Sequence, residues 1–114
     1  MDFRLKDKLE VNGINVEKGL SRYLDSEHAY FEALKDFFND NSFNEFIHFI
    51  DLDLSLAITR SANLPNVVNG LGMEKFSSDI KAVIRLLKLG KIDKKTIDNL
   101  VEEFNSLKEI IDLL

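Results

Sequence analysis

Apolar residues recur every three or four positions along most of this chain, and few residues that would break a helix interrupt them. The sequence has one proline and five glycines in 114 residues. Such spacing places apolar side chains on one face of an α-helix, whereas a half-buried strand needs an apolar residue at every second position. Beyond residue 12 we find no convincing strand pattern. The chain is therefore predicted to be all-α, an up-and-down antiparallel four-helix bundle.

Capping residues and breaks divide the chain into its expected helices. The side chains of Asn15 and of Asp25 or Ser26 can accept hydrogen bonds from the free N–H groups at a helix start. A short helix is therefore predicted after Asn15, with an apolar face made of Val16, Leu20, Tyr23 and Leu24, and a longer helix after residue 25 or 26. Further helices are expected after a break at 39–42, over 53–71 and 73–89, and after Asp93. Residues 1–12 fit a period of two as well as a helix, and we interpret them as an arm packed on a single domain of residues 13–114.

Composition and charge disfavour several classes of function. Hydrophobic residues make up 45% and charged residues 31% of the chain, which is typical of a globular domain. The absence of cysteine excludes disulfides and thiol catalysis, and no metal-ligand spacing or Ser/His/Asp arrangement stands out. A net charge of −5 disfavours general nucleic-acid binding. No apolar run approaches the ~20 residues of a membrane span or forms a signal-peptide centre. We expect a cytoplasmic protein that is not an enzyme and has no metal, cofactor, nucleic acid or membrane partner.

Two segments resemble the histidine phosphotransfer (HPt) family. The first covers 13–38, where a Gly-Ile-Asn-Val start, a Gly-Leu pair, an acidic turn and Tyr30 follow the family's order. The second is SANLPNVVNGLGMEKFS at 61–77, where the family reads approximately Ala-His-x-Leu-Lys-Gly and then Asn-Leu-Gly before a new helix. The resemblance covers roughly residues 13–114. It implies a helical bundle that exchanges a phosphoryl group with receiver domains of two-component systems through a histidine.

The second segment departs from the family's diagnostic motif at three positions. Aligning Leu71 and Gly72 with the family's Leu-Gly places Ala62 at the phosphoacceptor histidine. Pro65 then falls on the family's lysine and Asn66 on its glycine. A methyl group has no lone pair with which to attack an acyl phosphate, and proline cannot supply positive charge to phosphoryl oxygens. The resemblance therefore implies a member that cannot accept a phosphoryl group at position 62.

Pro65 also has a structural consequence. A proline inside a helix removes one backbone hydrogen bond, costs ~3 kcal/mol and restricts the residue before it. We predict a kink near 62–65, or a helix end with Pro65 as the first residue of a new turn.

The helix that carries Ala62 is predicted to have two distinct faces. Its inward stripe is expected to be Leu54, Ala57, Ser61, Leu64, Val68 and Leu71. The resemblance assigns partner binding to the opposite face, through Ile58, Thr59, Ala62, Asn63 and Asn66. Ile58 could be a docking contact, could be covered by the arm at 1–12, or could be exposed without a role. A group of cations could steer an acidic partner or form a solvated surface: Lys75, Lys81, Arg85, Lys88, Lys91, Lys94 and Lys95.

These observations support one leading function and two alternatives. The leading hypothesis is an HPt-like signalling module of phosphorelay systems that binds a receiver or kinase domain without phosphotransfer. The first alternative is an active phosphotransfer protein that uses His48 or a site outside this alignment. The second is a structural or self-associating bundle, and the oligomeric state is left open. We interpret His48 as a partly buried packing residue and His28 as a surface residue.

Overall fold

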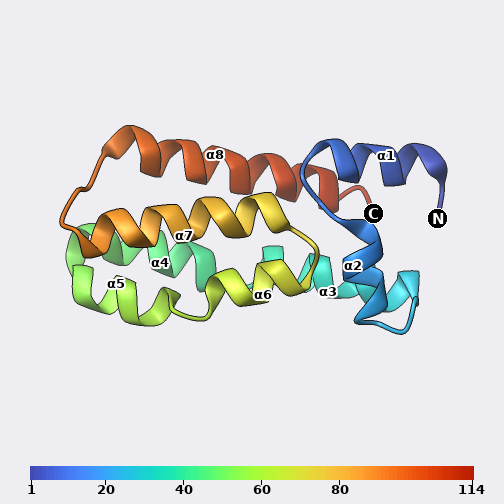
Figure 1. Cartoon of the computed structure of the whole chain (residues 1–114), viewed down its shortest axis with the longest axis horizontal. Helices are drawn as coiled ribbons and strands as arrows, with labels where there is room; N and C mark the ends of the chain where they lie inside the picture. Colours follow the sequence, from blue (N-terminus) through green and yellow to red (C-terminus); the bar gives the residue numbers. More distant parts are fainter.

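The computed structural model describes residues 1–114 as eight α-helices with no β-strand, so the all-α prediction is confirmed. The helices are α1 (Phe3–Val11), α2 (Val16–Ser21), α3 (Glu27–Asn39), α4 (Ser42–Leu52), α5 (Leu54–Ser61), α6 (Leu64–Gly70), α7 (Glu74–Lys88) and α8 (Lys94–Ile111). Helices α3 to α8 lie along the 43 Å length of the molecule, and the chain reverses direction after α4, α6 and α7 (Figure 1). None of the eight helices combines the length and the apolar character that a membrane crossing requires.

Side-chain caps begin the helices where the sequence predicts them. Asn15 accepts a hydrogen bond from the backbone of Lys18 at 3.1 Å, and Ser26 accepts one from Ala29 at 3.2 Å. Asp93 caps α8 in the same way. The predicted break at 39–42 also separates two helices. These helix starts could be predicted from the sequence because a cap depends only on residues within one turn of the helix start.

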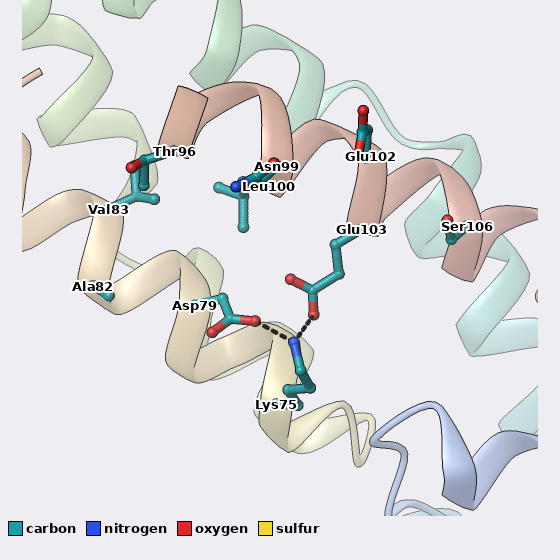
Figure 2. Close-up of a pocket in the computed structure, with 10 residues that line it drawn as sticks. All are labelled: Lys75, Asp79, Ala82, Val83, Thr96, Asn99, Leu100, Glu102, Glu103 and Ser106. Carbon is teal, nitrogen blue, oxygen red and sulfur yellow. Dashed lines mark hydrogen bonds and ion pairs between the residues drawn. The ribbon is translucent and has the colours of Figure 1, made fainter. Parts of the chain in front are cut away.

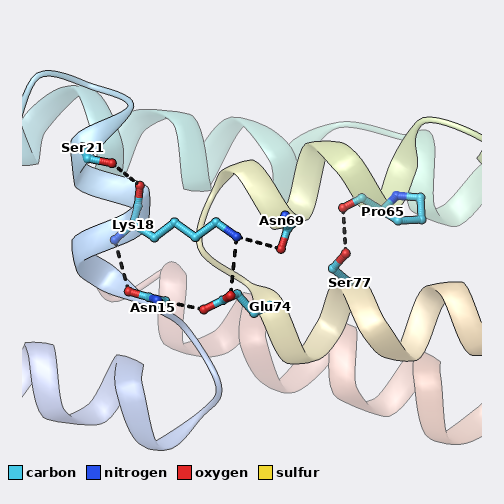
Figure 3. A network of polar contacts seen from close by, with 7 residues as sticks. All are labelled: Asn15, Lys18, Ser21, Pro65, Asn69, Glu74 and Ser77. Atoms are coloured by element: carbon cyan, nitrogen blue, oxygen red, sulfur yellow. Dashed lines mark hydrogen bonds and ion pairs between the residues drawn. The ribbon is translucent and has the colours of Figure 1, made fainter.

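The predicted break around Pro65 is confirmed. Residues 62–63 separate α5 from α6, and Pro65 is the second residue of α6. Proline is tolerated there because the first N–H groups of a helix have no partner within it. Helical bonding resumes when the N–H of Val67 donates to the carbonyl of Asn63 at 3.2 Å. The buried hydroxyl of Ser77 donates to the carbonyl of Pro65 at 2.8 Å, which ties α7 to the break (Figure 3).

The interior is centred on phenylalanine. Phe104 of α8 stacks on Phe43 of α4, with ring centroids 4.3 Å apart and planes at 7°. Phe37, Phe38 and Phe76 surround the Phe104 ring at centroid distances of 5.1 to 6.3 Å. Since phenylalanine has no polar atom that needs a partner, these rings can pack from several helices into one dry cluster. Phe104 therefore joins α8 to α3, α4 and α7.

In the N-terminal part the structure decides one question that the sequence left open, the form of residues 1–12, and corrects one expectation, the burial of Leu24. Residues 3–11 form a helix, and of its apolar residues only Leu9 is fully buried, while Phe3 is 81% exposed. Leu24 was predicted on the apolar face of the helix after Asn15, but it is 94% exposed. The reason is that α2 ends at Ser21, and Leu24 lies in the following turn with a φ of 53°.

The two segments that carry the family resemblance meet at one place, which we call the Tyr30 joint: Asn15, Gly19, Tyr30, Leu71 and Gly72. The buried hydroxyl of Tyr30 donates to the carbonyl of Leu71 at 2.7 Å. The backbone N–H of Asn15 donates to the carbonyl of Gly72, also at 2.7 Å. A Cβ on Gly19 would lie 2.4 Å from the Tyr30 ring, so only glycine lets the ring pack there. The joint fastens α2 and α3 to the turn between α6 and α7.

A polar network reinforces the Tyr30 joint from the surface (Figure 3). The side-chain amide of Asn15 donates to the Glu74 carboxylate at 2.8 Å. The Lys18 ammonium lies 3.1 Å from the Asn69 side-chain oxygen and 3.4 Å from Glu74. The hydrogen bond from Asn15 and the positive charge of Lys18 lower the pKa of Glu74. These groups fix one end of the α6–α7 pair, on which the candidate site below is built.

Candidate partner-binding groove

Ala62 directly follows α5 and is exposed, which confirms the expectation that position 62 faces solvent. Thr59, Asn63 and Asn66 are exposed as well, whereas Ile58 is half-buried. The residues predicted to face inward agree with this orientation, since five of the six are buried and the sixth, Leu54, is half-buried. The face that the resemblance assigns to partner binding is therefore accessible.

Four of the five predicted partner-binding residues line one groove between α5–α6 and α7, and Asn63 lies outside it. The groove has a volume of about 530 Å³. Its lining residues are Ile58, Thr59, Ala62, Pro65 and Asn66 on one wall and Lys81, Ile84, Arg85 and Lys88 of α7 on the other. Ile58 and Ile84 both pack against the hydrophobic core, so they supply the apolar part of the groove.

The position of Ile58 resolves the question of what covers it. The arm at 1–12 does not, because α1 lies at the opposite end of the molecule from α5 (Figure 1). Ile58 is instead half-buried against the hydrophobic core, and Ile84 of α7 lines the same groove. The second wall was missed by the sequence analysis, because helical spacing describes the faces of one helix and not which faces of two helices meet.

The charge of the groove differs from that of the molecule as a whole. Lys81, Arg85 and Lys88 line it, and no carboxylate does, although the chain carries a net charge of −5. None of these three cations takes part in any of the protein's eight ion pairs. The four other principal hollows each have at least one Asp or Glu in their lining. The groove is therefore a local electropositive surface on an acidic protein.

The cations predicted as one group are divided by the tertiary structure. Lys75 pairs with Asp79 and Glu103 in a hollow between α7 and α8. Lys81, Arg85 and Lys88 line the groove next to Ala62, while Lys91, Lys94 and Lys95 lie exposed in the following loop and the start of α8. Only three of the seven thus reach the face that the sequence analysis assigned to a partner.

The groove lining has no nucleophile suited to accepting a phosphoryl group. Ala62 offers a methyl group, and the Thr59 hydroxyl donates to the carbonyl of Ser55 at 2.9 Å. Asn66 contributes an amide, which is not nucleophilic. The floor of the groove is apolar, and its α7 wall carries positive charge.

The interpretation of His48 as a partly buried packing residue is wrong. His48 is exposed on α4, and its ring meets the Phe49 ring edge-on with centroids 5.5 Å apart. It lines a hollow of about 400 Å³ together with Glu45 and Arg60, on a different set of residues from the groove. His48 is exposed although its neighbours in the sequence are apolar, because this position lies on the side of α4 that faces away from the core. His28 is exposed, as predicted.

The hollow between α7 and α8 contains the most perturbed carboxyl group of the protein (Figure 2). The Lys75 ammonium lies 2.7 Å from Asp79 and 3.2 Å from Glu103. Burial, together with a hydrogen bond with Asp79 and its negative charge, raises the pKa of Glu103 to about 7. The pKa of Asp79 is lowered, because its hydrogen bonds with Glu103 and Lys75 and the Lys75 charge together outweigh the effect of burial. No group of three or more His, Cys, Asp or Glu residues could hold a metal ion here or elsewhere.

This arrangement predicts a pH dependence of stability. Folding raises the pKa of Glu103 from 4.5 to about 7, so the folded state holds this proton more tightly than the unfolded chain. The Glu103 contribution to the free energy of unfolding should therefore increase as the pH falls from about 7 towards 4.5. Urea unfolding at pH 5 and pH 7.5 should show that Glu103→Gln removes this increase. Glu102→Gln, an exposed neighbour, is the control, and an unchanged pH dependence in Glu103→Gln would contradict the prediction.

Comparison with known proteins adds no assignment to this geometry. No protein-family model matches the chain, and searches of curated proteins and of solved structures return no match. The groove, the exposed position 62 and the resemblance carried by the two sequence segments are the features of this chain that bear on its function.

Proposed function

We propose that this chain is an HPt-like module of two-component signalling that binds a receiver or kinase domain without accepting a phosphoryl group. The observation that carries the proposal is the exposed methyl group of Ala62, at the position of the family's histidine, beside an apolar groove with three unpaired cations. Binding without transfer would sequester the partner or hold it in a complex.

The helix arrangement supports the proposal. The chain direction alternates along α3–α4, α5–α6, α7 and α8 (Figure 1). Taken as four rods, with breaks at residues 40–41 and 62–63, they would correspond to the four-helix bundle that the resemblance implies. The Tyr30 joint gives a physical reason why these sequence features would occur together. Its glycines, its tyrosine and its Leu-Gly turn contact one another, so the packing would need all of them.

The proposal predicts that the groove residues are needed for binding. Ile58→Asp places a charge on the apolar floor of the groove, and Ala62→Arg places a long side chain at the edge of the groove. Each should weaken binding to a receiver domain by at least about tenfold, equivalent to about 1.4 kcal/mol. The measurement is titration calorimetry against a panel of purified receiver domains, after circular dichroism has shown that each variant is folded.

The matched control for this experiment is Val11→Asp, which changes an exposed apolar residue of α1 that does not line the groove. It should leave the affinity unchanged. Equal loss in Val11→Asp and Ile58→Asp would contradict the assignment of the groove. Absence of binding to every receiver and kinase domain tested would favour a structural or self-associating bundle.

The equivalence of position 62 with the family's histidine can be tested by restoring the imidazole. Ala62→His should acquire acid-labile label from a phosphorylated receiver domain, because the exposed ring would then lie beside the groove cations. The control is Ser55→His, an exposed position on α5 that does not line the groove. Equal labelling of both variants, or labelling of neither, would count against the alignment.

His48 supports an alternative, an active phosphotransfer protein with a different acceptor. The ring is exposed and shares its hollow with Arg60, whose charge could stabilise phosphoryl oxygens. Incubation of the wild-type chain with a phosphorylated receiver, followed by phosphohistidine detection, tests this alternative. Label that disappears in His48→Gln would establish it and would overturn the proposal of binding without transfer.

A further inference from the structure

We propose that the loop between α7 and α8 binds the surface of an anionic lipid bilayer, with Leu89 and Ile92 entering the bilayer and the surrounding lysines contacting the headgroups. We call residues 88–95 the basic tip. The proposal goes beyond the proposed function, because residues 89–95 do not line the partner-binding groove. The lack of a spanning apolar run, which led us to expect no membrane partner, bears only on membrane crossing and not on contact with a membrane surface.

The basic tip is the longest uninterrupted run of exposed residues in the chain. Leu89 is 62% exposed and Ile92 is 48% exposed, and a Cβ added to Gly90 between them would meet no atom within 4 Å. The loop nevertheless has a fixed shape. Two backbone hydrogen bonds, of 2.9 and 3.0 Å, return from it to the last turn of α7, and Asp93 caps α8. The two apolar side chains are therefore held in place and left open to solvent.

The charge of the basic tip is opposite to that of the whole chain. Its four lysines and single aspartate leave a net charge of +3, whereas the chain carries −5. The carboxylate of Asp93 accepts hydrogen bonds from the backbone of Lys95 and the hydroxyl of Thr96, both at 3.0 Å, so it is engaged at the start of α8. None of the protein's eight ion pairs includes any of the four lysines, which are Lys88, Lys91, Lys94 and Lys95. An anionic surface would therefore meet four free ammonium groups.

The negative charge of the rest of the molecule does not prevent this contact. The α7–α8 loop lies at the opposite end of the 43 Å molecule from α1 and both chain ends (Figure 1). Charges are largely screened beyond about 8 Å at physiological ionic strength. The turn between α4 and α5 lies at the same end as the loop, and there the exposed Leu52 stands between Asp51 and Asp53. Because anionic lipid would repel these two carboxylates, the molecule would approach with the α7–α8 loop foremost.

The shape and composition of the basic tip favour a bilayer over other anionic partners. Residues 89–95 line none of the five principal hollows, so a peptide would find no groove there. A second copy that met the tip about a two-fold axis would bring the same lysines together. A nucleic acid would leave Leu89 and Ile92 unused, and the tip has no aromatic ring on which bases could stack. A bilayer accommodates both features, since apolar side chains enter its acyl region while lysines stay among the headgroups.

Sedimentation with lipid vesicles tests the contact. One set of vesicles is phosphatidylcholine alone, and the other contains equal parts of phosphatidylcholine and phosphatidylserine. We expect at least about tenfold stronger partition into the phosphatidylserine vesicles, because each lysine near an anionic surface strengthens binding about fivefold. Lys91→Glu/Lys94→Glu should remove that difference. Arg4→Glu/Lys8→Glu changes the net charge equally at exposed positions of α1 and should preserve it.

A fluorescence measurement tests the entry of the apolar side chains. The chain has no cysteine, so a single introduced cysteine can be labelled selectively. A nitrobenzoxadiazole label on Ile92→Cys should brighten and shift to the blue with the phosphatidylserine vesicles, and the same label on Val11→Cys should not. Leu89→Ser/Ile92→Ser should weaken partition at least about tenfold. Phe3→Ser/Val11→Ser, which also removes two exposed apolar side chains, should leave partition unchanged. Circular dichroism shows that each variant is folded.

The outcomes decide the proposal without reference to a receiver domain. Partition that is equal into the two kinds of vesicle, or that survives in Lys91→Glu/Lys94→Glu, would overturn it. Partition that needs the lysines but is unchanged in Leu89→Ser/Ile92→Ser, with no blue shift, would indicate a purely ionic contact that an acidic protein could also provide. That result would overturn entry into the bilayer. Because receiver binding is measured separately, failure of this proposal and failure of the proposed function are distinguishable.

Discussion

Replacing Phe104 by alanine is expected to lower the free energy of unfolding by about 3–5 kcal/mol, the usual cost of removing a buried aromatic ring. The Phe104 ring is only 3% exposed and stacks on Phe43 at a centroid distance of 4.3 Å. It also contacts the phenylalanine rings of α3 and α7, so its removal would leave a cavity bordered by side chains from three other helices. Those rings are fixed on separate helices, so they cannot close the cavity without moving the backbone.

Urea unfolding followed by circular dichroism would measure this loss. Phe3→Ala is the matched control, because the same atoms are removed from a ring that is 81% exposed. We expect a change within about 0.5 kcal/mol for this variant, as is usual for exposed positions. A loss below about 1 kcal/mol in Phe104→Ala would mean that the ring cluster does not hold α8 to the rest of the protein.

Replacing Gly72 by alanine is the second change with a large expected effect, a loss of more than about 2 kcal/mol from backbone strain and steric overlap together. Gly72 has a φ of +86°, a conformation that costs an L-residue about 1–2 kcal/mol. A Cβ at this position would also lie 2.3 Å from the backbone oxygen of Asn15, so one of the two segments must move. Such movement would disturb the 2.7 Å hydrogen bond from the Asn15 N–H to the Gly72 carbonyl and loosen the Tyr30 joint.

Gly90→Ala separates the two components of this effect. Gly90 has a φ of +69° but no atom within 4 Å of the position of an added Cβ. Its replacement should therefore show the backbone strain alone, about 1 kcal/mol. Thermal unfolding of both variants gives the comparison, and equal losses at the two glycines would show that the approach of Asn15 does not constrain Gly72.

The site and the fold are connected through the α6–α7 pair. The Tyr30 joint holds the turn at one end of this pair, and the Ser77 hydroxyl holds α7 to Pro65 beside the groove. The two walls of the groove are thereby kept at a defined separation. A groove that is formed in advance loses less conformational entropy on binding a ligand, so variants that loosen the Tyr30 joint are also expected to weaken the partner binding that we propose.

The sequence by itself determined the helical class, most helix limits and the break at Pro65. Each of these depends on residues close in the chain: Asn15, Ser26 and Asp93 cap the helices that they precede. The apolar spacing likewise identified which side of α5 faces inward, and therefore that Ala62 is exposed. Local rules failed where a helix ended earlier than its apolar pattern, as at Leu24, or where the pattern was ambiguous, as in α1.

Only the tertiary structure decided that the groove has a second wall and that this wall is positively charged. Periodicity shows which residues share a face of one helix, but the rotation of α7 against α5–α6 is set by packing of the whole core. That rotation brings Lys81, Arg85 and Lys88 next to Ala62 and leaves Lys75 with Asp79 and Glu103. The same packing leaves His48 exposed, although its neighbours in sequence are apolar. Contacts between segments that are distant in the chain depend on how the whole core packs, so they cannot be predicted from short stretches of sequence.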